Sequence, residues 1–210
     1  AFASSQPCQP SNRCALIVHG ESVSNGDHGA STSGIIFGDG AGDVTGVTRG
    51  LLPLGQGIIA DYDYLDIFDP PPPPPGHSSR YTHTGELVNA SLPYKAVFQS
   101  TSAGSTSTFI YTTISYDMDD ILFDFDLVHC QAQGNEASRL SVPQAWAKNT
   151  ISVGGVEHFN NPDSSDDLWC EVNYVSCGFR AGCTSIGPAA DGRVKPDLVH
   201  FYDAIYCPTS

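Results

Sequence analysis

Basic residues are scarce in this chain. Only 9 of its 210 residues are Lys or Arg, against 23 Asp or Glu, and the formal net charge is −14. Binding to a phosphate backbone or to an anionic lipid surface requires positive charge concentrated on one face. Nucleic acids and membranes are therefore not expected as partners.

Long apolar runs are also missing. No stretch approaches the roughly 18 consecutive apolar residues that a membrane-spanning helix requires, and the N-terminus lacks the basic and then apolar pattern of a signal peptide. We therefore expect a soluble chain that, if it is secreted, has already been processed. With 40% hydrophobic residues and this length, the chain can build the core of one domain of moderate size.

Several chemical motifs are absent. The sequence holds no Cys-x-x-Cys pair, no His-Glu-x-x-His and no phosphate-binding Gly-x-x-x-x-Gly-Lys loop, so zinc and nucleotide chemistry have no support. Acidic residues do gather in two segments, which contain Asp39 and Asp43, and Asp61, Asp63, Asp66 and Asp69. Such oxygen ligands suit Ca²⁺, but no Asp-x-Asp-x-Asp-Gly loop is present. A solvated acidic surface is the favoured interpretation, and no metal ligand is assigned.

Cysteine, in contrast, is abundant for a reduced cytosolic protein. The chain has seven: Cys8, Cys14, Cys130, Cys170, Cys177, Cys183 and Cys207. We therefore expect an extracellular protein with disulfide bonds. Their pairing stays open, although Cys8–Cys14 and Cys170–Cys177 are near neighbours, and the odd number leaves one thiol free or bonded to another chain. Asn89-Ala90-Ser91 would accept a glycan in a eukaryotic secretory pathway.

The first half of the chain is irregular in composition. Residues 1–27 form a polar N-terminal segment, and propensity predicts a loop for the glycine-rich residues 28–50. The apolar residues 57–60 predict a short buried strand. Pro70 through Pro75 predict an exposed polyproline II segment. We interpret residues 66–94 as a surface insertion and a stiff spacer, in preference to a docking site for a proline-recognising partner.

The second half has the clearest periodicity. Residues 95–99 predict a strand, and apolar residues then recur with the period of an amphipathic helix: Ile114, Met118, Ile121, Leu122 and Phe125. Residues 127–132 and 151–153 predict two further strands. Strand, helix and strand in succession predict a parallel βαβ unit. Chemistry in such sheets gathers beyond the carboxyl ends of the strands, which points to residues 100–105 and 133–137.

Three segments resemble, in order, those of the subtilisin-like serine proteases (subtilases). The stretch Gly26-Asp27-His28-Gly29-Ala30-Ser31 is similar to the family's His motif, which opens a helix of small residues. The resemblance implies that His28 is the general base that takes the proton of the nucleophile.

The second segment follows the predicted strand at 127–132. Ala132-Gln133-Gly134-Asn135-Glu136 is similar to the family's Ala-Gly-Asn-Glu-Gly stretch, which implies that the amide of Asn135 donates to the oxyanion of acyl transfer. Ser102-Ala103-Gly104 matches the Ser-x-Gly segment that pairs with extended substrate in subtilases. Together with Gly134, these three residues are the expected substrate-binding residues.

The third segment carries structural motifs. Residues 143–155 resemble the family's Pro-x-x-Ala-Lys-Asn-x-Ile-x-Val-Gly-Ala segment, and residues 185–188 and 191–197 resemble its Ser-x-Gly-Pro and Asp-Gly-Arg-x-Lys-Pro-Asp stretches. The likeness covers roughly residues 26–62 and 95–200. It implies an α/β, subtilisin-like three-layer fold with a mainly parallel sheet and helices on both faces, incomplete in this chain.

The chain also departs from the family. No strand ending in Asp-Ser/Thr-Gly precedes His28, and no Gly-Thr-Ser segment follows residues 191–197. Ser210 has no glycine before it and is not assigned as nucleophile. Where the family continues with Val-Ala-Pro-Gly, this chain has residues 199–202, Val-His-Phe-Tyr.

These observations lead to one interpretation and one alternative. Residues 28–210 would be a partial catalytic domain of a secreted serine endopeptidase that acts through an acyl-enzyme, inactive by itself, with its Asp and Ser on a further segment or a second chain. Its partner would be a peptide or protein substrate. It would need no cofactor, although the resemblance allows Ca²⁺. The alternative is a catalytically inactive subtilase-like module in an extracellular assembly.

Overall fold

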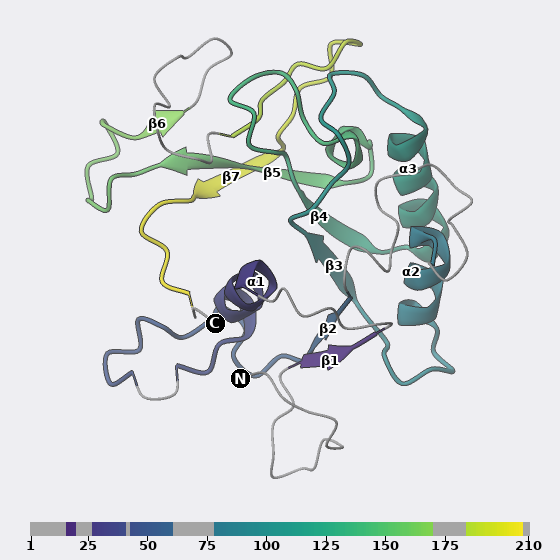
Figure 1. Cartoon of the computed structure of the whole chain (residues 1–210), viewed down its shortest axis with the longest axis horizontal. Helices are drawn as coiled ribbons and strands as arrows, with labels where there is room; N and C mark the ends of the chain where they lie inside the picture. The colour runs from purple at the N-terminus through teal and green to yellow at the C-terminus, as the bar shows by residue number, and fades with distance from the viewer. Residues whose placement is uncertain (1–15, 20–26, 41–42, 61–77, 170–183, 208–210) are drawn as a thin grey trace. The chain divides into compact units, whose positions relative to one another are not determined.

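The computed structural model describes residues 16–19, 27–40, 43–60, 78–169 and 184–207 (Figure 1). The chain forms two compact units, of which the first is Ala1–Tyr64 with Ile205–Ser210 and the second is Leu65–Ala204. None of the helices in the described ranges combines the length and the apolar character of a membrane span.

A small parallel βαβ arrangement makes up the first unit. Strand β1 (Leu16–Val18) pairs in parallel with β2 (Gly57–Ile59), and helix α1 (Asp27–Phe37) lies between them in the sequence. The predicted strand at 57–60 is therefore present, but Ile59 is exposed. β1 and α1 both belong to this unit, and the division at residue 27 stays a prediction. Strand β1 was not predicted, because three residues are too few to show an alternating pattern.

Helix α1 corrects the loop that propensity predicts for the first part of residues 28–50. Its C-terminal carbonyls, which have no partner inside the helix, are bonded by the returning chain: Leu51 N–H donates to Ile35 O at 3.0 Å and Leu52 N–H to Ile36 O at 2.6 Å. A glycine-rich sequence can therefore hold a helix here because a later segment satisfies its end. The helix agrees with the subtilase resemblance rather than with propensity.

The second unit is built on a five-stranded, mainly parallel sheet within the described residues. Strands β3 (Phe98–Thr101), β4 (Val128–Ala132), β5 (Ile151–Glu157) and β7 (Leu198–Phe201) run parallel, and β6 (Leu168–Trp169) pairs with β5 antiparallel. The α/β class is thus confirmed. The first of these strands begins three residues later than predicted: Lys95 has a left-handed backbone with φ of 51°, and the Ala96 N–H donates to Leu87 O instead of to the sheet.

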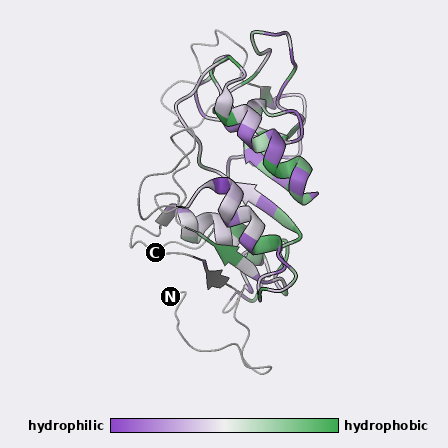
Figure 2. Cartoon of the chain, turned by 90° about the vertical axis from the view of Figure 1, so that its right-hand side faces the viewer, coloured by the Kyte–Doolittle hydropathy of each residue, from purple (hydrophilic) through white to green (hydrophobic). Residues whose placement is uncertain are grey.

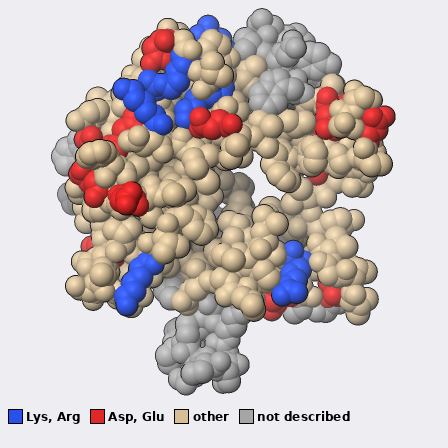
Figure 3. All heavy atoms as spheres, turned by 180° about the vertical axis from the view of Figure 1, so that it is seen from behind, with Lys and Arg blue, Asp and Glu red and all other residues tan. Residues whose placement is uncertain are grey.

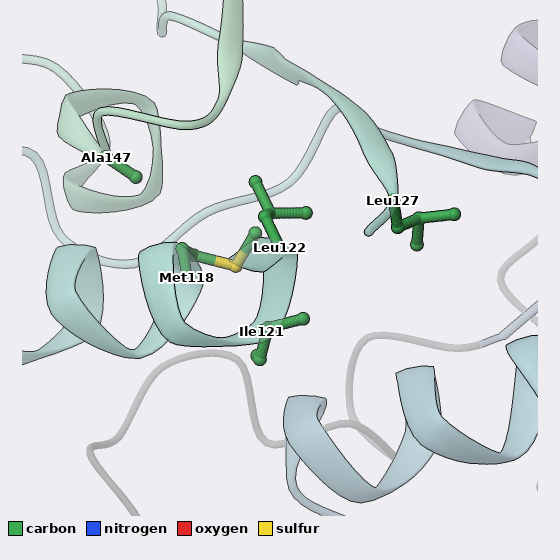
Figure 4. Packing of buried hydrophobic residues seen from close by; sticks show 5 residues of the cluster. All are labelled: Met118, Ile121, Leu122, Leu127 and Ala147. Carbon is green, nitrogen blue, oxygen red and sulfur yellow. The ribbon is translucent and has the colours of Figure 1, made fainter. Parts of the chain in front are cut away.

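Helix α3 (Thr113–Phe125) connects β3 to β4, and its predicted apolar face is confirmed. Met118, Ile121 and Leu122 are buried in one cluster with Leu127 and Ala147 (Figure 4). Hydrophilic and hydrophobic residues are mixed along the helices that face the viewer in Figure 2, as expected where one side of a helix packs on a core.

Helix α2 (Arg80–Val88) corrects the interpretation of residues 66–94 as a surface insertion, at least for 80–88. Its residues His83, Thr84 and Leu87 are buried. It packs against α3, because Arg80 pairs with Asp117 at 3.0 Å and Tyr81 Oη donates to Asp124 at 2.8 Å. The sequence did not predict this helix, because its residues are mostly polar and a run of prolines precedes it. Residues 61–77, which include Pro70–Pro75, lie outside the described residues.

The two faces of this sheet differ. One face is covered by α2: the Nε2 of Gln99 on β3 donates to Thr84 Oγ1 of that helix at 3.1 Å. His129 on β4 lies beside Gln99 on the same face and is buried. The opposite face carries Phe98, Val128 and Leu198, which are 42%, 53% and 59% exposed. The predicted second helical layer is not found on that face among the described residues of this unit.

Only two of the seven cysteines lie in the described residues. Cys130 on β4 is half-buried, Cys207 is exposed, and both are free thiols. The other five lie outside the described ranges. The predicted disulfides therefore stay a prediction.

Candidate functional site

An open groove of about 460 Å³ lies beyond the carboxyl ends of β3 and β4. One wall is formed by residues 102–107, which follow β3. The other is formed by Gln131 and Ala132 at the end of β4 and by residues 134–136, with Val142 between the walls. The structure therefore brings together all the residues assigned to substrate binding and to the oxyanion.

Buried glutamines hold the first wall. Gln131, which is 1% exposed, donates from Nε2 to the carbonyl of Ala103 at 3.0 Å. Gln144 accepts from the N–H of Ser105 at 3.1 Å and donates to its hydroxyl at 3.0 Å. Gly104 packs so tightly that a Cβ there would lie 2.5 Å from Val142 Cβ. The backbone of the first wall is therefore held at Ala103, Gly104 and Ser105.

A tight turn forms the second wall. Gly134 has a φ of +125°, a conformation that side chains rarely adopt. Ser185 N–H donates to Gly134 O at 2.8 Å, and Ser185 Oγ accepts from Glu136 N–H at 3.1 Å. Asn135 lies between these two bonds with its side chain exposed. Its amide has no hydrogen-bond partner among the described residues, so it is available to a ligand.

The groove has little charge. Among the described residues that line it, Glu136 is the only ionisable one. Elsewhere on the molecule charged side chains do gather: Figure 3 shows Lys or Arg beside Asp or Glu toward one upper edge of the view and a group of Asp and Glu toward the other. Behind the first wall, His129 Nε2 lies 3.3 Å from Gln131 Oε1. Burial lowers the pKa of His129 to about 4, against a smaller opposing effect of the Gln131 hydrogen bond, and the charge of Arg80 lowers it further. His129 is therefore neutral at pH 7, and an Nε2–H tautomer would donate to Gln131.

His28 belongs to the first unit, in the first turn of α1. Its side chain is exposed, and the hydroxyl of Thr32 donates to its carbonyl at 3.0 Å. Because the groove belongs to the second unit, the association of His28 with Asn135 stays a prediction.

The acidic segments provide no metal centre in the described residues, where no group of three or more His, Cys, Asp or Glu side chains is arranged to hold an ion. Asp43 instead caps a turn: hydrogen bonds from the side chain and backbone of Thr45 and from Thr48 hold its pKa well below the usual range. Asp61, Asp63, Asp66 and Asp69 lie outside the described residues.

Three residues that shape the groove were missed by the sequence analysis. Ser185 was recognised only as part of a structural motif, while Gln131 and Gln144 were given no role. Gln131 did leave a signal, because a glutamine within the apolar run of a predicted strand must find hydrogen-bond partners when it is buried. Gln144 and Ser185 left none, because their partners are distant in the sequence.

Comparison with known proteins finds only distant likeness. No protein-family model matches the chain, and no curated protein matches it. Among solved structures, it is similar to the prenylagaramide maturation protease PagA, with a TM-score of 0.48 and 16% identity over 82% of this chain and 51% of that one. A mutant of the protease domain of PatA gives 0.48 and 17%, over 74% of this chain and 55% of that one. The patellamide maturation protease PatA gives 0.46 and 18%, over 74% and 53%. The chain thus spans about half the length of these structures.

Proposed function

We propose that this chain is part of a secreted subtilisin-like serine endopeptidase, which hydrolyses peptide bonds through an acyl-enzyme. One observation carries the proposal. Residues 102–104 and 134–135, which resemble the substrate-binding and oxyanion segments of subtilases, are far apart in the sequence and line one groove. A chance resemblance of two unrelated short motifs would not be expected to place them on facing walls.

The first wall suits an extended peptide. Strand β3 pairs only with β4 in the described sheet, so one side of β3 and of the residues that continue it has no neighbouring strand. A peptide could add itself there through main-chain hydrogen bonds. Because Gln131 and Gln144 fix residues 103–105, this wall would be preorganised before the substrate arrives.

The second wall suits the developing negative charge. The Asn135 amide is a neutral donor at the apex of a turn that Ser185 holds from both sides. Losing one such donor typically costs about 3 kcal/mol of transition-state stabilisation in acyl transfer. Gly134 allows the turn to pack on Ser185, since a Cβ there would lie 2.9 Å from the Ser185 hydroxyl.

Proton transfer is assigned to His28, since imidazoles take up and release protons near neutral pH. The serine that forms the acyl-enzyme would belong to a segment outside these 210 residues or to a second chain, because no Gly-Thr-Ser motif occurs within them. The Asp that would orient the imidazole of His28 is likewise assigned to a further segment or a second chain, because no Asp-Ser/Thr-Gly strand precedes His28.

Fluorophosphonate labelling of the native protein, followed by intact mass and peptide mapping, tests the proposal. We expect a label on a serine outside residues 1–210. His28→Ala should abolish labelling, and Asn135→Ala should slow it about 100-fold. Ser164→Ala, at an exposed polar residue outside the groove, is the control and should label normally. Absence of any label would reject the protease and leave the inactive binding or structural module.

A further inference from the structure

One buried titratable side chain beside the groove has no part in the chemistry assigned above. His129 on β4 is 3% exposed, and Gln131 two positions later is 1% exposed. Side chains two residues apart point to the same face of a strand, so both lie in the layer between the sheet and its helices. Polar groups in such a layer must find hydrogen-bond partners, and those of this pair lead to the groove.

Two consecutive hydrogen bonds connect the imidazole to the first wall. His129 Nε2 lies 3.3 Å from Gln131 Oε1. At its other end, Gln131 Nε2 donates to the carbonyls of Ala103 and Ala132 at 3.0 and 3.3 Å. Turning this amide by 180° would place its oxygen against two carbonyl oxygens, none of which can donate. The orientation of Gln131 is therefore defined, and its oxygen faces His129.

This orientation determines where His129 carries its proton. Because an amide oxygen only accepts, Nε2 of the imidazole must hold the hydrogen. Nδ1 is buried and has no hydrogen-bond partner among the described residues, so a second proton there would be a buried donor without an acceptor. Burial and the charge of Arg80 also disfavour the imidazolium, and the pKa of His129 is lowered to about 4 although the Gln131 hydrogen bond opposes this. His129 is thus a neutral donor with one available N–H.

We infer that His129 is a positioning residue for peptide binding, which acts through Gln131 to hold the Ala103 carbonyl and with it the wall along which an extended substrate lies. The inference rests on the proposed function and deepens it, because it concerns the same groove. His129 is not among the residues that line that groove, so its effect must pass through the amide.

Removing the donor shows what the positioning contributes. Without His129, the buried oxygen of Gln131 keeps no donor among the described residues, and the amide gains by moving toward another one. Ala103 O would then lose its partner. Ser105 is held separately by Gln144, so the wall should loosen at Ala103 while the rest of it stays in place.

Two covalent probes of the native full-length protein test the inference. A small alkyl fluorophosphonate reacts with the nucleophile without extending along the first wall, whereas a phosphonate that carries four alanine residues on its acyl side lies along it. The ratio of the two second-order labelling rate constants, peptidyl over small, therefore reports on the wall separately from the chemistry. His129→Leu should lower this ratio about tenfold, as expected for the loss of one positioned hydrogen bond.

Further variants assign the effect to the bond with Gln131. His129→Gln places an amide nitrogen near the position of Nε2 and should restore most of the ratio. In a Gln131→Leu background, His129→Leu should lower the ratio no further, because the group through which it acts is already missing. Thr84→Val is the matched control: it removes the hydrogen bond from Gln99 on the same buried face of the sheet and should leave the ratio unchanged.

The outcomes separate this inference from the proposed function. Labelling by neither probe rejects the protease, and the inference with it. If the small probe labels but the ratio is the same in wild type and His129→Leu, or if the wild type reacts no faster with the peptidyl probe, the positioning role is overturned while the protease stands. An equal fall of the ratio in Thr84→Val, or no recovery in His129→Gln, would also overturn it, because the loss would then come from general disturbance of the buried layer.

Discussion

Ser185 holds Gly134 and the residue two positions beyond it, and so fixes both ends of the turn that carries Asn135. Its N–H donates to Gly134 O at 2.8 Å, and its hydroxyl accepts from Glu136 N–H at 3.1 Å. A Cβ on Gly134 would approach the same hydroxyl to 2.9 Å. The direction in which Asn135 points is therefore set by a residue that lies far from it in the sequence.

The first prediction concerns this hydroxyl. Ser185→Ala removes the acceptor of the Glu136 N–H, and loss of a hydrogen-bond partner at a partly buried group should lower the free energy of unfolding by about 1–3 kcal/mol. Because the turn also loosens, fluorophosphonate labelling should slow. Urea denaturation and labelling rates measure the two effects.

Ser165→Ala is the matched control for this change. Ser165 is exposed and bonds only locally to Asp163, so its loss should affect neither quantity. Wild-type stability and labelling in Ser185→Ala would contradict the positioning role of Ser185.

The sequence was informative where apolar residues recur over several turns or strands. Helix α3 shows its apolar face over about three turns. The strands on either side of it have apolar residues of their own, so the end of the sheet that carries the groove could be predicted. Helix α2 could not, because it is short, polar and next to a proline run. Strand β1 has only three residues, which is too short for an alternation of buried and exposed positions to be recognised.

The place of the candidate site was predicted, because residues 100–105 and 133–137 were expected beyond the carboxyl ends of parallel strands, but the contacts that hold it were not. Gly134, Asn135 and residues 102–104 were each assigned by resemblance, and the structure adds what holds them. The bonds of Gln131, Gln144 and Ser185 all cross long sequence separations. Local patterns carry no information about such partners, so only the three-dimensional structure could reveal them.

The second prediction is a pH dependence that arises from His129. Burial lowers its pKa to about 4 in the folded chain, while an unfolded chain has the ordinary value of about 6.5. Between these values the unfolded chain binds a proton that the folded chain does not, so stability falls as the pH falls from about 6.5 to about 4. The loss should be on the order of 3 kcal/mol, and above pH 6.5 His129 should add no further dependence.

Removing the imidazole isolates this contribution. In His129→Gln the replacement amide could still donate to Gln131, and the variant should lose less stability than the wild type between pH 7 and pH 4. The same substitution at the exposed His200 controls for the loss of one histidine. Parallel stability curves for wild type and His129→Gln would show that His129 is protonated in the folded chain.

The third prediction concerns the buried Lys195, which connects the Lys-Pro-Asp segment to the start of β5. Its Nζ is bonded to Thr150 O at 2.7 Å and to Asp197 Oδ2 at 2.6 Å, and Asp197 accepts from the Ser152 N–H at 2.7 Å. Lys195→Met leaves the carbonyl and the carboxylate without their cation, and should reduce the free energy of unfolding by about 3 kcal/mol. Lys148→Met, at an exposed lysine, should change it little.

The pH dependence of the same variant distinguishes loss of the ion pair from loss of packing. Burial acts to raise the pKa of Asp197, but the hydrogen bond from Lys195 and those from Ser152 outweigh it, and the pKa is lowered. The wild type therefore gains stability from Asp197 above its ordinary pKa near 3.8 and loses it as the pH falls below that value. In Lys195→Met this acid-dependent loss should shrink, because the folded pKa rises. A variant that is destabilised equally at pH 7 and pH 2.5 would show that Lys195 acts through packing alone, and that the bonds from Ser152 suffice to hold Asp197.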